Sequence, residues 1–253
     1  RVHTPELVSR IVDAAIEHQD RIDADTAMNA DSPEAARHAA GAVVAAVDAV
    51  LGESSKVAFC AVRPPGHHAT RDTAMGFCLF NSVAVGAAHA LAKHGLQRVA
   101  IVDFDVHHGN GTQDIFQNDP RVLYVSSHQA PLYPHTGHAH ETGVDNLLNL
   151  PLAEGAAGDR IQEIYRTRAL PTLRAFRPQL LFISAGFDAH HLDPLAGLNL
   201  EAEDFIWLTQ ELMKVADECC EGRIVSVLEG GYSLAALREC SIAHVAALAG
   251  MLD

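Results

Sequence analysis

Two carboxylates and two imidazoles occupy residues 103–108, directly after a short apolar run at residues 98–102. The run is typical of a buried parallel strand, and the polar residues end it on a Gly-Asn-Gly sequence. Strand alternation would bring Asp103, Asp105 and His107 to one side, where they could bind a metal or transfer protons. A surface turn is the alternative, but charge at the end of an apolar strand is costly without a compensating partner.

Other chemically capable residues also follow apolar runs that predict strands. These are His67 and His68 after residues 56–62, Asp188 after residues 179–184, and Tyr232 after residues 223–228. Ligand sites of parallel α/β sheets lie at the carboxyl ends of the strands. The sequence therefore predicts that these groups share one site.

Two carboxylates and one imidazole, from Asp105, Asp188 and His107, match a catalytic metal site with positions left open for water and substrate. Zinc is the first expectation, although Fe²⁺ and Mn²⁺ also suit this donor set because it has no thiolate. For Asp188 alone, a helix cap or turn role is the alternative.

His67 and His68 follow a Pro-Pro-Gly turn, and adjacent imidazoles can divide the roles of proton acceptor and donor. A carboxylate behind one ring, such as Asp103, would favour its charged form, whereas an amide behind the other, such as Asn110, would not. Tyr232 follows two glycines and could donate to a developing oxyanion; a packed core tyrosine is the alternative.

The predicted strands and helices that position these residues alternate along the chain, which predicts an α/β fold with one parallel sheet flanked by helices. No repeat or linker divides residues 1–253, so we expect a single domain. A further strand is predicted at residues 121–126, and loops at residues 21–31 and 132–143. Helices are predicted at residues 1–20, 32–51, 81–94, 112–117, 160–176, 201–219 and 234–248.

A net charge of −14 argues against direct binding of nucleic acid and favours cationic partners. No apolar run is long enough to cross a membrane, and no signal-peptide pattern precedes the first helix. Five cysteines without a CxxC pair indicate a reducing compartment, so the cytoplasm is expected. A homo-oligomer is compatible with these features.

The motifs together resemble the zinc-dependent histone deacetylase superfamily. Asn110 and Glu229 place the resemblance on the class II side, near the bacterial histone deacetylase-like amidohydrolases. The resemblance implies the arginase/deacetylase α/β fold. The motifs are Pro-Gly-His-His at residues 65–68, Gly-Phe-Cys at 76–78, the run at 103–112, Ala-Gly-Phe-Asp at 185–188 and Glu-Gly-Gly-Tyr at 229–232.

By this resemblance, the chain removes acetyl or other acyl groups from lysine side chains. Zinc would be held by Asp105, His107 and Asp188, the catalytic residues would include His67, His68 and Tyr232, and His68 would return a proton to the amine. Gly76, Phe77 and Tyr133 would line an acyl-lysine tunnel. A structural potassium ion would be held by Asp103, Asp105, His107, Ser126 and Ser127. Phe116 and Val122 match an outer potassium site less closely.

Two departures accompany the resemblance. The family's opening strand and mobile loop are not visible before the first helix, so we expect that the chain lacks this opening segment. An acidic rim residue could be Asp25, on a weak local match.

Three other functions compete with lysine deacetylation. The first is deacetylation of small acetylated amines such as acetylpolyamines, which also give cationic products. The second is a domain that binds acylated partners without turnover, which would need a broken site. The third is an arginase-type hydrolase, which would need a second metal and more aspartate ligands.

Overall fold

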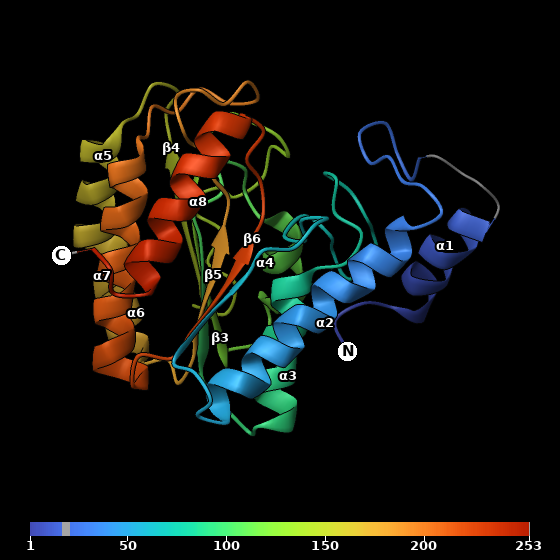
Figure 1. Ribbon diagram of the computed structural model, residues 1–253, viewed down its shortest axis with the longest axis horizontal. Helices are drawn as coiled ribbons and strands as arrows, with labels where there is room; N and C mark the ends of the chain where they lie inside the picture. Colours follow the sequence, from blue (N-terminus) through green and yellow to red (C-terminus); the bar gives the residue numbers. More distant parts are fainter. Residues whose placement is uncertain (17–20, 253) are drawn as a thin grey trace.

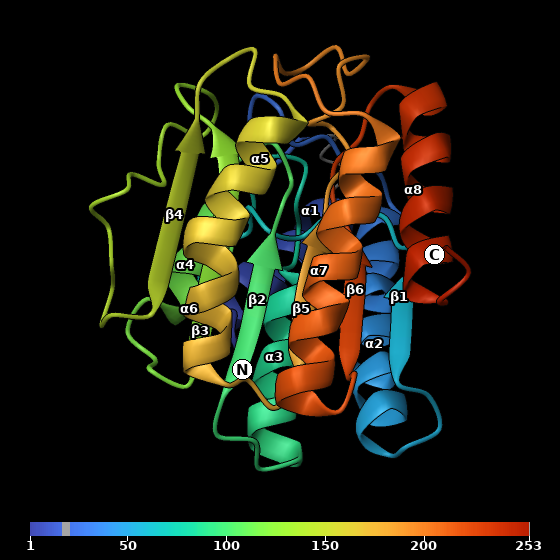
Figure 2. The ribbon, with the colours of Figure 1, turned by 90° about the vertical axis from the view of Figure 1, so that its left-hand side faces the viewer.

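The computed structural model of the chain describes residues 1–16 and 21–252. Its centre is a six-stranded, fully parallel sheet with the order β1-β6-β5-β2-β3-β4 (Figure 2). The fold is therefore the single parallel α/β domain predicted from the alternation of elements. The strands are β1 (Val57–Cys60), β2 (Val99–Asp103), β3 (Val122–Gln129), β4 (Leu147–Leu152), β5 (Leu181–Ala185) and β6 (Ile224–Leu228).

Helices cover both faces of this sheet, with α2 and α3 on one face and α5 to α8 on the other (Figures 1 and 2). Helix α1 packs against α2, away from the strands (Figure 1). The helices are α1 (Pro5–Ile16), α2 (Ser32–Leu51), α3 (Ser82–Lys93), α4 (Asn110–Phe116), α5 (Gly158–Ile164), α6 (Leu170–Phe176), α7 (Ala202–Cys220) and α8 (Leu234–Leu248), with a π-helical turn at Tyr165–Ala169.

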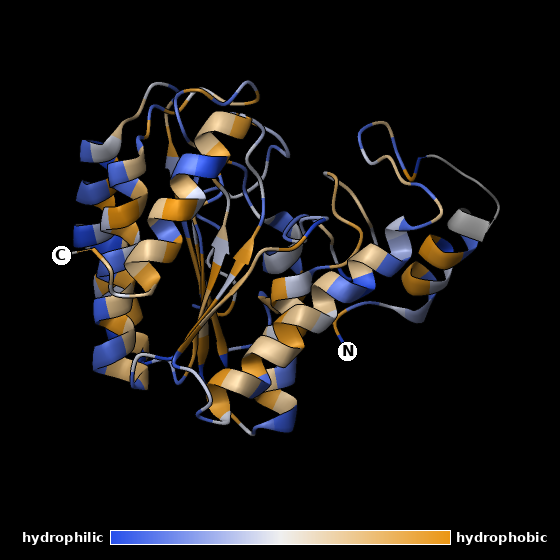
Figure 3. Cartoon of the chain, viewed as in Figure 1, coloured by the Kyte–Doolittle hydropathy of each residue, from blue (hydrophilic) through white to orange (hydrophobic). Residues whose placement is uncertain are grey.

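Strand β2 shows why the strands are continuously apolar. Its side chains alternate between the two faces, so that Ala100 and Val102 pack under α5 to α8 while Val99 and Ile101 pack under α2 and α3. Both faces are buried, and the hydrophobic strands lie between two layers of helices (Figure 3). None of the described helices is long and apolar enough to span a bilayer.

The edge strand β4 was not predicted. Its sequence Leu-Leu-Asn-Leu-Pro-Leu lacks β-branched residues and contains Pro151, which cannot donate to a neighbouring strand. An edge position tolerates this proline because β4 pairs on one side only, with β3.

Several predicted boundaries were also wrong. Strand β2 ends at Asp103, so Asp105 and His107 lie in the following loop and strand alternation does not position them. The single helix predicted at residues 160–176 is interrupted by the π-helical turn before Pro171, whose ring cannot fit a regular helix interior.

The first helix covers Pro5–Ile16, and the rest of its predicted range, residues 17–20, lies outside the described residues. Of the side chains in its predicted apolar stripe, Leu7 and Ile11 are buried, but Val8 and Val12 are exposed.

Candidate active site

Asp105, His107 and Asp188 come together at the carboxyl edge of the sheet, although they lie in the loops after β2 and β5. Each offers one donor atom, and the three atoms lie within 4.8 Å of one another. Nδ1 of His107 is 3.1 Å from Oδ1 of Asp105 and 3.1 Å from Oδ2 of Asp188. Both carboxylates are fully or almost fully buried.

Backbone amides hold each carboxylate by its other oxygen. The amide of Gly230 donates to Asp105 Oδ2 at 2.8 Å, and the amide of Val106 donates to Asp188 Oδ1 at 2.9 Å. The amide of His107 also donates to Asp105 Oδ1, at 2.9 Å. The loop after β2 is therefore shaped by hydrogen bonds to the carboxylates of Asp105 and Asp188 rather than by the strand.

Glycines permit this close approach. A Cβ atom at Gly186 would overlap the carboxylate of Asp105, and one at Gly230 would overlap that of Asp188. The glycines of the two sequence motifs thus leave the room that the buried carboxylates occupy.

The donor set fits a divalent cation. Nδ1 of His107 carries at most one proton, yet it faces two carboxylate oxygens at equal distance, and donors of a tetrahedral zinc ion would lie about 3.3 Å apart. Although burial alone would lower the pKa of His107, hydrogen bonds from its ring to the Asp105 and Asp188 carboxylates raise it to about 10. Burial and the charge of Asp105 raise the pKa of Asp188 to about 6. A bound dication would offset this excess of buried negative charge.

The tandem histidines lie beside these donors with different partners. Nδ1 of His67 is 3.0 Å from Asp103 Oδ2, and Nδ1 of His68 is 2.8 Å from Asn110 Oδ1. Although burial alone would lower it, the Asp103 and Asp105 carboxylates hold the pKa of His67 well above its usual value. Burial and the neighbouring His67 lower the pKa of His68 well below its usual value. One ring therefore favours the charged form and the other the neutral form.

Glu229 fixes the turn that carries these histidines, a role that the sequence did not suggest. Its Oε2 accepts the amides of Gly66 at 2.7 Å and His67 at 3.1 Å, and its Oε1 accepts the Ser184 hydroxyl at 3.0 Å. Burial raises the pKa of Glu229 to about 7.

Tyr124 is a second missed partner. Its hydroxyl donates to Asp103 Oδ2 at 2.9 Å, so the carboxylate behind His67 is itself held in place. A buried tyrosine within an apolar strand gives no sequence signal for this contact.

A narrow pocket of about 210 Å³ opens beside the donors. The predicted tunnel residues Gly76, Phe77 and Tyr133 line it, together with Asp25, His68, His107, Leu132, Leu195 and Tyr232. The Tyr133 ring meets the His68 ring edge to face at 5.2 Å. Across the pocket, the Phe77 ring meets that of Tyr232 at 5.7 Å.

The N-terminal loop supports the wall at Gly76 and Phe77. The amide of Gly76 donates to Asp25 Oδ1, and the amide of Phe77 donates to Thr26 Oγ1, both at 3.3 Å. Gly76 adopts φ +57°, and a Cβ there would lie 2.5 Å from Cδ2 of His68. Glycine is therefore required at this position, and Thr26 was not identified from sequence.

Tyr232 reaches the pocket from the Gly-Gly turn after β6, where Gly231 adopts φ +132°. Its backbone amide donates to Asp193 Oδ2 at 2.7 Å, which anchors the turn. Burial and the charges of Asp188 and Asp105 raise the pKa of the Tyr232 phenol, so it remains a hydrogen-bond donor near neutral pH.

The residues of the predicted inner potassium site come from β2, the loop that follows it and β3, where Asp103 of β2 pairs with Ser126 of β3. The Ser126 hydroxyl bonds to His128 at 2.9 Å, and the Ser127 hydroxyl bonds to Tyr165 at 3.0 Å.

The predicted outer site has a different arrangement. The carbonyls of Phe116 and Val122 each accept the side-chain amide of Asn146 at 2.8 Å. Neither potassium site is tested by these contacts, and both remain predictions.

Fold and site together define a parallel α/β domain with a candidate metal centre, and comparison with known proteins identifies its family. The histone deacetylase domain matches residues 1–248. The chain belongs to the histone deacetylase family. This membership supports a deacetylase or amidohydrolase activity.

Individual relatives agree with this assignment. A histone deacetylase-like amidohydrolase of Pseudomonas aeruginosa is 39% identical over 99% of this chain and 67% of its own length. The rice protein histone deacetylase 10, chloroplastic, is 45% identical over 78% of this chain, which spans only 47% of that protein. The crystal structure of the HDA15 HD domain superposes with a TM-score of 0.94 at 38% identity, covering 98% of this chain and 71% of that one.

Proposed function

We propose that the protein is a zinc-dependent deacetylase that removes acetyl or other acyl groups from lysine side chains. The observation that carries the proposal is the convergence of the donors Asp105, His107 and Asp188 beside His68 and Tyr232, which both line one narrow pocket. A zinc ion held by these three donors would polarise the acyl carbonyl and activate water for attack. Proton transfer and stabilisation of the negative charge on the carbonyl oxygen would be carried out by His68 and Tyr232.

His68 is the proposed proton carrier. Asn110 Oδ1 accepts from its Nδ1, so the neutral ring keeps the lone pair of Nε2 free as a base. His68 would take a proton from the attacking water and return it to the amine nitrogen as the C–N bond breaks. Acetate and a free amine are the products. His67, held by Asp103, would remain charged and keep its neighbour neutral.

Tyr232 would donate its phenolic proton in a hydrogen bond to the oxygen of the substrate carbonyl as negative charge develops there. The rings of Phe77 and Tyr133 would flank the apolar part of a lysine side chain. Asp25, which is part of the same lining, would accept a hydrogen bond from the substrate near the mouth of the pocket.

Deacetylation of a small amine, such as an acetylpolyamine, is the second candidate. The carboxylate of Asp25 at the pocket supports it, because it would also attract the free ammonium groups of a polyamine. We propose that a structural potassium ion supports the loop after β2 in either case. We also propose a cytoplasmic location.

The test is acetate release by metal-stripped protein reconstituted with one equivalent of zinc. An acetyl-lysine peptide and an acetylpolyamine are assayed in parallel at matched concentrations, with the stripped protein as the control. Zinc-dependent turnover with a higher kcat/KM for the peptide supports the proposal. A higher kcat/KM for the acetylpolyamine would favour the second candidate, and no turnover of either substrate would refute both.

A further inference from the structure

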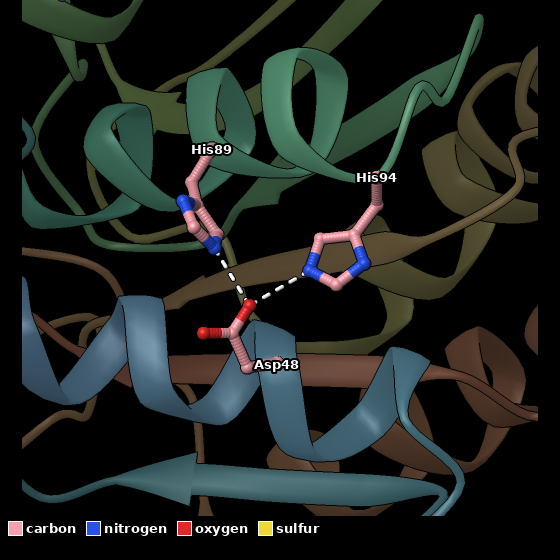
Figure 4. A group of neighbouring side chains, drawn as sticks. All are labelled: Asp48, His89 and His94. Carbon is pink, nitrogen blue, oxygen red and sulfur yellow. Dashed lines mark hydrogen bonds and ion pairs between the residues drawn. The ribbon is translucent and has the colours of Figure 1, made fainter.

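A second group of potential metal ligands lies outside the active site, between α2 and α3. Asp48 comes from α2, His89 from α3 and His94 from the residue that follows α3 (Figure 4). Both histidines direct Nε2 to the same oxygen, Asp48 Oδ1, each at 2.7 Å. One donor atom from each residue lies within 4.8 Å of the other two.

An ordinary ion pair explains this arrangement poorly. A single exposed histidine beside a carboxylate is common on helices, as with His38 and Glu34, whose contact is 2.9 Å. Here two rings converge on one oxygen from separate segments. Among the ion pairs of the described residues, Asp48 has no lysine or arginine partner. Two imidazoles and a carboxylate, with donor atoms this close together, form a ligand set typical of zinc-like ions.

The backbone around the cluster favours a cation. Asp48 lies in the last turn of α2 and His94 caps the C-terminus of α3, so the negative ends of two helix dipoles meet there. The exposed Lys93 next to His94 carries a positive charge, which opposes the binding of a cation. Helices α2 and α3 also pack closely, and a Cβ at Gly86 would lie 2.5 Å from a methyl carbon of Val43. The ligands therefore stand on helices whose spacing is fixed.

This cluster is separate from the active site. Helices α2 and α3 each lead into the start of a strand, β1 and β2, so their C-terminal ends lie at the amino edge of the sheet (Figure 1). The active site lies at the carboxyl edge. An ion in the cluster would consequently join two helices without contacting substrate.

We propose that Asp48, His89 and His94 form a surface site for a borderline divalent cation such as Zn²⁺. Three side chains would act as ligands, and water would complete the coordination. Ligand atoms of a tetrahedral zinc ion lie about 3.3 Å apart, so each Nε2 must move about 0.6 Å farther from Asp48 Oδ1 than its present 2.7 Å. Their exposure permits this movement, since the side chain of Asp48 is 52% exposed and that of His94 is 26% exposed. Among the described residues, no hydrogen bond orients the Nδ1 atom of His89 or of His94, which predicts a modest affinity for the metal ion.

The experiment is a zinc titration of the folded protein, followed by calorimetry and by measurement of bound metal after gel filtration. The wild type is compared with His89→Gln, His94→Gln and the matched control His38→Gln. We expect the two cluster variants to lose one zinc equivalent, or to bind it at least about tenfold more weakly. The control should keep the wild-type stoichiometry.

Comparison between variants separates this site from the active site, because both cluster variants keep every residue of the catalytic centre. Their deacetylase activity should equal that of wild type. The proposal is overturned if all four proteins bind the same number of zinc ions with the same affinity. Loss of an equivalent from the His38→Gln control would also overturn it, because a single His-carboxylate pair would then explain the binding.

Discussion

Glu229 provides the most specific test of how the fold positions the tandem histidines. Its carboxylate is fully buried and accepts three hydrogen bonds, two of them from the amides of Gly66 and His67. Replacing Glu229 by alanine would leave both amides and the Ser184 hydroxyl without their partner. A buried donor without an acceptor costs about 1–3 kcal/mol, so we expect a loss of about 3–5 kcal/mol in the free energy of unfolding.

Activity should fall as well, because the turn that orients His67 and His68 would lose its anchor. A displacement of about 1 Å at a catalytic group can lower the rate about 10²-fold, and we expect a loss of this size in kcat/KM for Glu229→Ala. Zinc content should remain that of wild type, since Glu229 contacts none of the three proposed ligands in the described structure.

Glu229→Gln is the matched control. Its amide oxygen can still accept the two backbone amides, while its amino group faces the Ser184 hydroxyl, which can act as an acceptor. We expect kcat/KM within about fivefold of wild type and a smaller loss of stability. Urea unfolding, kcat/KM and zinc content are measured for both variants. If Glu229→Ala keeps wild-type kcat/KM while folded, or if both variants lose activity equally, the positioning role is refuted.

The other predictions concern the proposed catalytic groups and acid stability. Tyr232→Phe should lower kcat by about 10²–10³ with little change in KM, and activity within tenfold of wild type would exclude an oxyanion role. Asp188→Ala should lose zinc together with activity, and metal analysis showing full occupancy would remove Asp188 from the ligand set. Burial lowers the pKa of His244 to about 3, so below about pH 6.5 the unfolded state binds a proton that the native state does not. The free energy of unfolding should therefore decrease as the pH is lowered from about 6.5. Between pH 6 and 4, His244→Gln should reduce this dependence by up to about 1.4 kcal/mol per pH unit. The same pH dependence in urea unfolding of both proteins would contradict this prediction.

The sequence predicted the elements whose patterns are local. Continuous apolar runs identified the strands of the sheet other than β4, because most positions of these strands pack against helices on one face or the other. The edge strand β4 was missed although β1, at the other edge, was predicted. The proline and asparagine of β4 are compatible with a loop as well as with an edge strand, whereas β1 is apolar throughout.

The parts of the candidate site that were predicted are short sequence patterns that seldom serve a purely structural role, such as tandem histidines and Asp-x-His after a strand. Asp103 and Asn110 were also predicted as partners of the two rings, and they contact His67 and His68. Other supporting residues were not predicted. Thr26 reaches Phe77 across 51 positions, and Glu229 reaches Gly66 across 163. Such contacts depend on how distant loops pack, and no local pattern encodes them.

The loop after β2 illustrates how the fold replaces a regular element with hydrogen bonds. Extension of the strand beyond Asp103 would have placed successive donors about 7 Å apart along one face, too far for one ion. Instead, the amide of Asp105 donates to Asp103 Oδ1 at 3.2 Å and the amide of His107 donates to Asp105 Oδ1 at 2.9 Å, which turns the chain back on itself. The same aspartates that would bind metal or orient His67 therefore also build the backbone that holds them. This coupling means that a substitution at Asp103 or Asp105 changes the shape of the loop together with its chemistry. Asp188, in the loop after β5, holds the loop after β2 through one amide only, that of Val106, so its substitution changes that loop less.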